Sequence, residues 1–284
     1  MVKSFIPKTF REALEILSEN NLTIMAGGTD LMVKNRKWSG LAPGFKGDVL
    51  FISQLAELNF IRKENGRIYI GAAVTLERLL HEDNIPELLK KAISLMASPG
   101  IRHTASLVGN IGNASPAGDS LPVLYILNAK IVLKSLISER TIPIENFILG
   151  PGSKDIQQDE MIREIVIDDV KFDYIMYEKV GGRKSDAISK VSFAGAVSSV
   201  FGMVSDIRIA FGAVASTIVR FEEYETRFRD MPVSDIARMA EMIKELYEPH
   251  IQPINDQRST AAYRKKCALN ILGKFLAETE KSYR

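Results

Sequence analysis

Two glycine-containing segments carry the residue types that could bind a phosphate, and the first of them is Gly27-Gly28-Thr29-Asp30. It follows a short apolar run, residues 22–26, that is typical of a buried strand. Glycine lets a ligand approach the backbone N–H groups, and a threonine hydroxyl can donate a further hydrogen bond. Asp30 would repel a phosphate, so we expect its carboxylate to hold the turn instead. A tight turn without a ligand is the competing interpretation of this segment.

The second segment, residues 100–120, is rich in glycine, serine and asparagine. Loops of this length inside a compact domain are usually functional or disordered, and the apolar residues interleaved here argue against disorder. Such a stretch can wrap a large polar ligand. A purely structural loop is the alternative, but ordering one of this length costs conformational entropy. Its candidate hydrogen-bonding side chains are Ser106, Asn110, Ser115 and Asp119.

Other motifs of nucleotide binding or catalysis are absent from the sequence. No strand is followed by G-x-G-x-x-G with an acid about 20 residues later. There is no Walker motif, no H-E-x-x-H and no nucleophile elbow. The three histidines are better interpreted as surface or capping residues, although His103 lies close to the second segment. We therefore assign no catalytic acid or base and no metal ligand.

The elements that would position these segments form an α+β pattern. Thr9-Phe10-Arg11-Glu12 is a capping box that predicts a helix start, and Asn65-Gly66 predicts a hairpin. The chain of 284 residues suits two domains, and the pattern changes near residues 169–171. We expect the division at 1–170 and 171–284. Beyond it, strands are predicted at 191–201 and 203–214, and helices at 233–247 and 259–276.

Composition excludes several classes of partner. Lys and Arg number 37 against 35 Asp and Glu, which gives no electrostatic reason to expect nucleic acid. Cys267 is the single cysteine, so it cannot by itself hold zinc or an iron–sulfur cluster. No apolar stretch is long enough for membrane insertion, and residues 1–10 do not have the pattern of a signal peptide. We expect a cytoplasmic protein.

Blocks of sequence spread along the chain resemble the FAD-binding (medium) subunit of the xanthine dehydrogenase and carbon monoxide dehydrogenase family of molybdenum hydroxylases. Residues 26–31 are similar to the family's first flavin loop, and residues 106–119 to its second. One departure is Val108, since many relatives have a glycine before Gly109. Further similar blocks, in the family's order, are 48–52, 70–75, 210–215 and 258–264.

The resemblance implies a two-part FAD-binding domain of the molybdopterin-dehydrogenase (PCMH-like) type over 1–170, with subdomains of about 1–54 and 55–170. It implies a smaller α+β domain over 171–284, with a three-stranded antiparallel sheet and helices. It also places the FAD pyrophosphate between the two glycine loops. With Ser115 from the loop composition, the candidate cofactor-binding residues are Ala26, Gly27, Gly28, Thr29, Asp30, Leu31, Ser106, Gly109, Asn110, Ser115, Asp119, Ile162 and Lys190.

Two of these residues have particular implied roles. Ile162 would contact the cofactor through its backbone. Lys190 matches a lysine near the flavin ring, where it could stabilise negative charge on the reduced flavin. A solvated charge at the start of a strand is the competing interpretation of Lys190.

The function implied is electron transfer within a larger complex. An iron–sulfur subunit and a molybdopterin-binding large subunit would be the partners, and FAD on this chain would pass electrons to NAD or another acceptor. Molybdopterin and 2Fe-2S clusters would lie only on the partners. Two other hypotheses stay open at this point: a self-contained FAD-dependent reductase on a related fold, and an assembly subunit without flavin. Both glycine loops argue against the latter.

Overall fold

The computed structural model describes residues 2–183 and 186–283, and the chain divides into two units. The first comprises Met1–Ile85, Ala97–Ala114 and Asn128–Asp169. The second comprises Pro86–Met96, Ser115–Leu127 and Val170–Arg284, so it takes two segments from the N-terminal half of the chain. These units are not continuous in sequence, so the domain boundary predicted at 170/171 stays a prediction. Lys184 and Ser185, which precede Lys190, lie outside the described residues.

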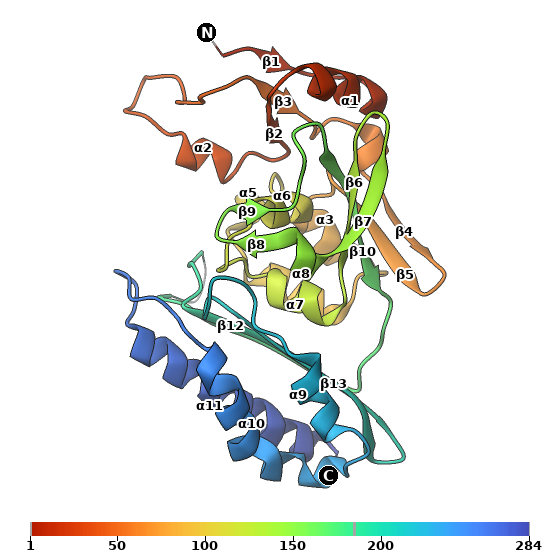
Figure 1. Cartoon of the computed structure of the whole chain (residues 1–284), viewed down its shortest axis with the longest axis vertical. Coiled ribbons are helices and arrows are strands. Elements are labelled where there is room, and N and C mark those ends of the chain that lie inside the picture. Colours follow the sequence, from red (N-terminus) through yellow and green to blue (C-terminus); the bar gives the residue numbers. More distant parts are fainter. Residues whose placement is uncertain (1, 184–185, 284) are drawn as a thin grey trace. The chain divides into compact units, whose positions relative to one another are not determined.

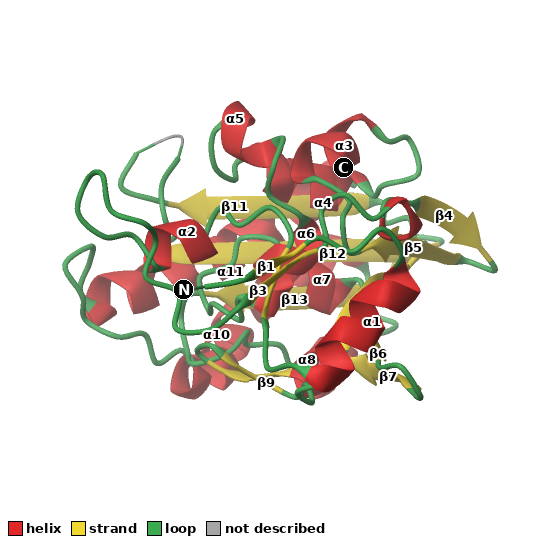
Figure 2. Cartoon of the chain, turned by 90° about the horizontal axis from the view of Figure 1, so that it is seen from above, coloured by secondary structure: helices red, strands yellow, loops and turns green. Residues whose placement is uncertain are grey.

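The first unit begins with a parallel sheet in the order β1-β3-β2, and Figure 2 shows β1 and β3 side by side. Helix α1, Phe10–Glu19, begins at Thr9, whose hydroxyl accepts a hydrogen bond from the Glu12 N–H at 3.1 Å. The predicted helix start is thus confirmed. The first glycine loop leaves β2 at its carboxyl end, where parallel sheets commonly bind ligands. The strands are β1 Ser4–Phe5, β2 Thr23–Met25 and β3 Val49–Phe51, and the short helix α2 is Leu31–Lys34.

A five-stranded antiparallel sheet, in the order β4-β5-β10-β6-β7, is the larger sheet of the first unit. Ile70, Ile165 and Ile131 lie opposite one another on three central strands and are fully buried, so they form part of the core. The strands are β4 Ile61–Glu64, β5 Arg67–Gly71, β6 Lys130–Lys134, β7 Glu139–Pro143 and β10 Met161–Asp168. The short elements are η1 Ala56–Leu58, α3 Leu76–His81, α5 Pro99–Arg102, α6 Leu107–Gly112, α8 Ile144–Phe147, β8 Ile148–Gly150 and β9 Ser153–Lys154.

The second unit is built on the antiparallel sheet β11-β12-β13, which confirms the three-stranded sheet implied by the family resemblance. Helices α10 and α11 lie along one face of this sheet and α7 along the other (Figure 1). Phe193 packs between Phe211 and Phe275, with ring centroids 5.1 Å and 5.4 Å away. The strands are β11 Tyr174–Val180, β12 Val191–Val200 and β13 Met203–Gly212. The helices are α4 Glu87–Ser94, α7 Leu121–Ile126, α9 Glu222–Glu225, η2 Thr226–Phe228, η3 Val233–Met239, α10 Ala240–Tyr247, η4 Glu248–His250 and α11 Ala261–Ser282.

The prediction of one long loop over 100–120 is wrong in part, because α6 lies inside it. Ser106 caps this helix by accepting a hydrogen bond from the Gly109 N–H at 3.0 Å. Leu107, Val108 and Ile111 are buried, and this packing offsets the poor helix propensity of the glycines. In the part of the chain that the structure describes, no helix has the length and apolar character needed to cross a membrane.

Candidate functional site

The first glycine loop, residues 26–31, presents a run of backbone donors. Gly28 has a φ of +69°, in the left-handed region that favours glycine. The loop's carbonyls are used, since Gly28 O accepts from Met32 N at 2.8 Å and Asp30 O accepts from Lys34 N at 2.9 Å. Within the described residues, by contrast, the five N–H groups from Gly27 to Leu31 donate no hydrogen bond. Consecutive free amides of this kind form a concave site for an anion.

The second loop runs directly against the first. A Cβ atom on Gly27 would lie 1.9 Å from the Thr104 carbonyl oxygen, so only glycine fits there. The stretch beyond Thr104 is fixed by a hydrogen bond from Leu76 N to Ala105 O at 2.8 Å and by the bridge between Thr75 and Ser106. The two loops, distant in sequence, are therefore neighbours in the first unit. The sequence predicted this proximity only through the family resemblance.

Side chains link the loops as well. The Asn113 amide nitrogen donates to the Asp30 carboxylate, and the Lys34 ammonium donates to the Asn113 amide oxygen. The Asp30 carboxylate thus contacts a side chain of the second loop and makes no capping hydrogen bond to its own turn. The expectation that it holds its own turn is therefore wrong. Neither Asn113 nor Lys34 was among the predicted site residues. Asn113 could have been found, because it lies in the polar stretch that was singled out.

The remaining predicted residues of the first unit fall near these loops. Ser106 is buried as the cap of α6, and Asn110 lies one helical turn further on. Ile162 is on β10 at an irregularity of the strand pairing, and a Cβ atom on Gly112 would lie 3.9 Å from its Cδ1. The structure therefore brings Ile162 to the second loop. Its contact with a cofactor stays a prediction.

Ser115, Asp119 and Lys190 belong to the second unit, where they are described separately. The Ser115 hydroxyl accepts from the Ala117 N–H at 3.3 Å, which shapes the end of the loop. The Lys190 ammonium lies 5.5 Å from the centroid of the Tyr263 ring, within the range of a cation–π contact. Lys190 directly follows Ser189, whose hydroxyl contacts Asp119.

Asp119 is the centre of a buried polar cluster. Its carboxylate accepts from the Lys179 ammonium at 2.8 Å and from the Ser189 hydroxyl at 2.5 Å. The Tyr177 hydroxyl donates to the Asp119 carbonyl at 2.9 Å, and Lys179 also reaches the Leu95 carbonyl at 2.7 Å. Burial raises the pKa of Asp119, and Lys179 and Ser189 oppose that shift. The carboxylate therefore ties β11 to the segment that leads into Lys190.

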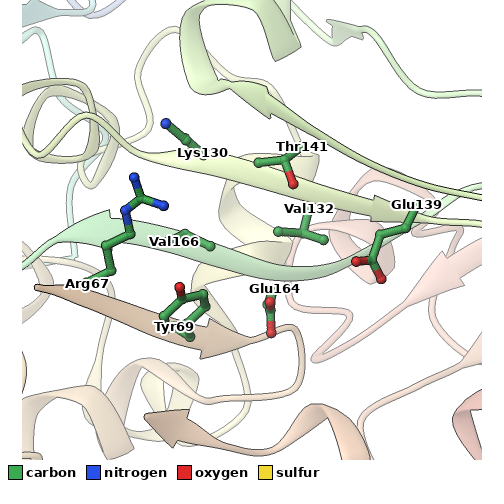
Figure 3. Close-up of a pocket in the computed structure, with 8 residues that line it drawn as sticks. All are labelled: Arg67, Tyr69, Lys130, Val132, Glu139, Thr141, Glu164 and Val166. Atoms are coloured by element: carbon green, nitrogen blue, oxygen red, sulfur yellow. The ribbon is translucent and has the colours of Figure 1, made fainter. Parts of the chain in front are cut away.

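A separate depression of about 240 Å³ lies on the five-stranded sheet of the first unit (Figure 3). Arg67 and Lys130 lie toward one end of it and Glu139 and Glu164 toward the other (Figure 3). Glu164 is only 4% exposed, and burial raises its pKa against the opposing charges of nearby arginines. None of the predicted cofactor residues lines this depression. The lining residues are Arg67, Tyr69, Lys130, Val132, Glu139, Thr141, Glu164 and Val166.

Comparisons with known proteins decide which family builds this pair of loops. The family described as the FAD binding domain in molybdopterin dehydrogenase matches residues 1–167, and the CO dehydrogenase flavoprotein C-terminal domain matches residues 176–279. The chain belongs to the molybdopterin-dehydrogenase FAD-binding family. The resemblance seen in the sequence, and the α+β fold class that it implied, are thereby confirmed.

Individual members of the family agree. The nicotinate dehydrogenase FAD-subunit of Eubacterium barkeri is 35% identical over 206 residues, which are 68% of this chain and 67% of that protein. The xanthine dehydrogenase FAD-binding subunit of Escherichia coli O157:H7 is 27% identical over 278 residues, 95% of this chain and 93% of that protein. The CO dehydrogenase of Oligotropha carboxidovorans matches in fold with a TM-score of 0.88 at 22% identity, covering 99% of this chain and 98% of that chain.

The first unit of this FAD-binding chain fits the cofactor of its family. Five free amides, a glycine that admits no Cβ and a second loop directly against them provide a cradle for a dinucleotide diphosphate. Gly27, Gly28 and Thr29 would hold phosphate oxygens through backbone N–H groups. Ser106 would act indirectly, since its hydroxyl is used in capping α6.

Proposed function

We propose that this chain is the electron-transfer subunit of a multi-subunit molybdenum hydroxylase. In this proposal it takes electrons from iron–sulfur clusters on a partner and delivers them to NAD or another acceptor. FAD, when bound, supplies the ability to accept and release electrons. The observation that carries the proposal is the run of free amides from Gly27 to Leu31 against the second loop.

The partners follow from what this chain can and cannot hold. A 2Fe-2S cluster is usually held by four protein ligands, commonly cysteines, and this chain has Cys267 alone. The relatives from Eubacterium barkeri and Escherichia coli are named as subunits. These facts support an iron–sulfur subunit and a molybdopterin-binding large subunit as partners. They also support a reducing compartment, and we place the complex in the cytoplasm.

The chain's own residues have binding and electrostatic roles in this proposal. The first loop and α6 orient the dinucleotide, and Ile162 adds a backbone contact. In the second unit, Lys190 supplies a positive charge, which would favour the reduced, anionic form of a flavin beside it. The Asp119 cluster holds the segment that carries Lys190.

Affinity purification of the chain from its own cells, followed by anaerobic titration with NADH, tests the proposal. We expect iron–sulfur and molybdopterin-containing chains to co-purify, and the flavin absorbance to disappear when the substrate of the large subunit is added. If the acceptor is not NAD, adding NADH should leave the flavin absorbance unchanged, whereas adding the substrate should still remove it. Oxidation of NADPH by this chain alone with a small-molecule substrate would contradict the proposal in favour of a self-contained reductase.

A further inference from the structure

The two glycine loops offer a diphosphate backbone amides but little positive charge. Asp30 is the only charged residue in the first loop, and it is acidic. In the part of the second loop that belongs to the first unit, residues 100–114, the one lysine or arginine is Arg102, and its guanidinium is paired with Glu77 at 3.0 Å. Backbone amides can hydrogen-bond a phosphate, but they carry no net charge and so leave its negative charge without a counter-ion. A cation from outside the loops would therefore complete the site.

Lys34, at the end of α2, is the first such cation. Its ammonium donates to the Asn113 side chain, which in turn donates to Asp30. Lys34 is thus held at the contact between the two loops although it belongs to neither. Its charge is only partly offset, because Asp30 is reached through a neutral amide.

Lys154, on β9, is the second. The turn between β8 and β9 is tied to the second loop by a hydrogen bond from Gly152 N to Ala114 O at 2.9 Å. The Lys154 ammonium has no hydrogen-bond or ion-pair partner among residues 2–183 and 186–283. Burial, and then the positive charge of Lys34, lower the pKa of Lys154. Lys34 and the turn that carries Lys154 are therefore both tied to neighbouring residues of the second loop, Asn113 and Ala114.

Like charges held together without a counter-ion are unfavourable in a partly buried setting. The arrangement becomes favourable when an anion lies between or beside them. We propose that Lys34 and Lys154 bind the diphosphate of a dinucleotide at the junction of the two glycine loops. This inference rests on the proposed function and adds to it the residues that neutralise the ligand.

Titrations of the flavin-free full-length chain with FAD, riboflavin and inorganic pyrophosphate test it. For Lys154→Met we expect FAD affinity to fall about tenfold or more, the effect of losing a charge-assisted hydrogen bond. Riboflavin, which lacks phosphate, should bind equally to both proteins. Pyrophosphate should compete with FAD in the wild type and much less in the variant. Lys34→Met should act in the same direction.

The matched control is Lys130→Met, which removes a partly buried lysine of the same unit from β6. Its FAD affinity should equal that of the wild type. If Lys154→Met kept its FAD affinity but needed more NADH to reduce the flavin, the diphosphate bound would be that of the acceptor. FAD, NADH and pyrophosphate binding all unchanged in both lysine variants would overturn the inference.

The inference and the proposed function fail in different ways. A wild-type chain that takes up no flavin would contradict the proposed function. Calorimetry with pyrophosphate alone would still decide the lysine pair, because binding to the wild type and its loss in Lys154→Met would support it. Equal loss of riboflavin and FAD affinity in Lys154→Met would show that the lysine acts on the flavin or the fold, and would contradict phosphate binding.

Discussion

The Lys179 ammonium lies 2.8 Å from the Asp119 carboxylate, and their side chains are only 7% and 11% exposed. Sixty residues separate them in sequence. A buried ion pair contributes little net stability relative to apolar residues, but removing one partner strands the other charge. The pair therefore holds the end of the second loop to β11.

We expect Lys179→Met to lower the free energy of unfolding by about 3 kcal/mol, because the Asp119 carboxylate loses its counter-charge. Urea unfolding measures this. Lys274→Met, which breaks a roughly half-exposed ion pair with Glu178, should cost under about 1 kcal/mol. The double variant Asp119→Asn/Lys179→Met should recover part of the loss. Equal effects of Lys179→Met and Lys274→Met would show that the buried pair is not what holds this segment.

Gly27→Ala tests the contact between the two loops. The added Cβ would meet the Thr104 carbonyl at 1.9 Å, so the loops must separate. We expect a loss of unfolding free energy of about 1–3 kcal/mol and a clear loss of FAD affinity. Gly100→Ala is the control, since a Cβ there meets nothing within 4 Å. FAD binding by Gly27→Ala at wild-type strength would show that the cofactor does not need this close approach.

Asn110→Ala tests the second loop alone. Removing a polar partner from a desolvated site should weaken FAD binding by about 1–3 kcal/mol, measured by flavin fluorescence during titration. Asn21→Ala, on the exposed surface of the same unit, should leave the affinity unchanged. An affinity equal to that of the wild type would show that Asn110 does not belong to the site.

Asp256 gives a prediction about pH. Burial would raise its pKa, but contacts with Arg264 and Arg258 outweigh burial and lower the pKa to about 2. A lowered carboxyl pKa stabilises the fold above the unfolded value of about 4, and this contribution is lost as pH falls toward 2. The difference in unfolding free energy between wild type and Asp256→Asn should therefore shrink over that range. A difference that does not change with pH would contradict the assignment.

Local signals in the sequence predicted several elements correctly for physical reasons that the structure displays. Thr9 caps α1 as its box predicts, and Asn65 and Gly66 both have positive φ in the turn between β4 and β5. The helix α6 was missed because Gly109 and Gly112 lower its propensity, while the packing that stabilises it comes from distant residues. Strand β11 was missed because its burial does not alternate clearly along the chain.

The site shows the same limit. The glycines were enough to single out both loops, because a ligand can approach the backbone closely only where the residue is small. Lys34 and Lys179 could not be selected among 37 basic residues, since their partners lie far away in the chain. Lys154 could not be selected either, because its turn is placed by a hydrogen bond between the distant residues Gly152 and Ala114. Asp119 was predicted as a cofactor contact, and the structure adds that Lys179 and Ser189 already use both of its carboxylate oxygens. Its role toward FAD stays a prediction.

The most direct measurement is the visible spectrum of the purified chain after incubation with FAD and gel filtration, for the wild type, Gly28→Val and Gly66→Val. Both glycines have a φ near +70°, but a Cβ on Gly66 meets nothing within 4 Å, so Gly66→Val controls for backbone strain alone. We predict that wild type and Gly66→Val retain flavin absorbance and that Gly28→Val loses it. A wild-type chain without flavin, or Gly28→Val as fully loaded as the wild type, would contradict FAD binding by the first glycine loop.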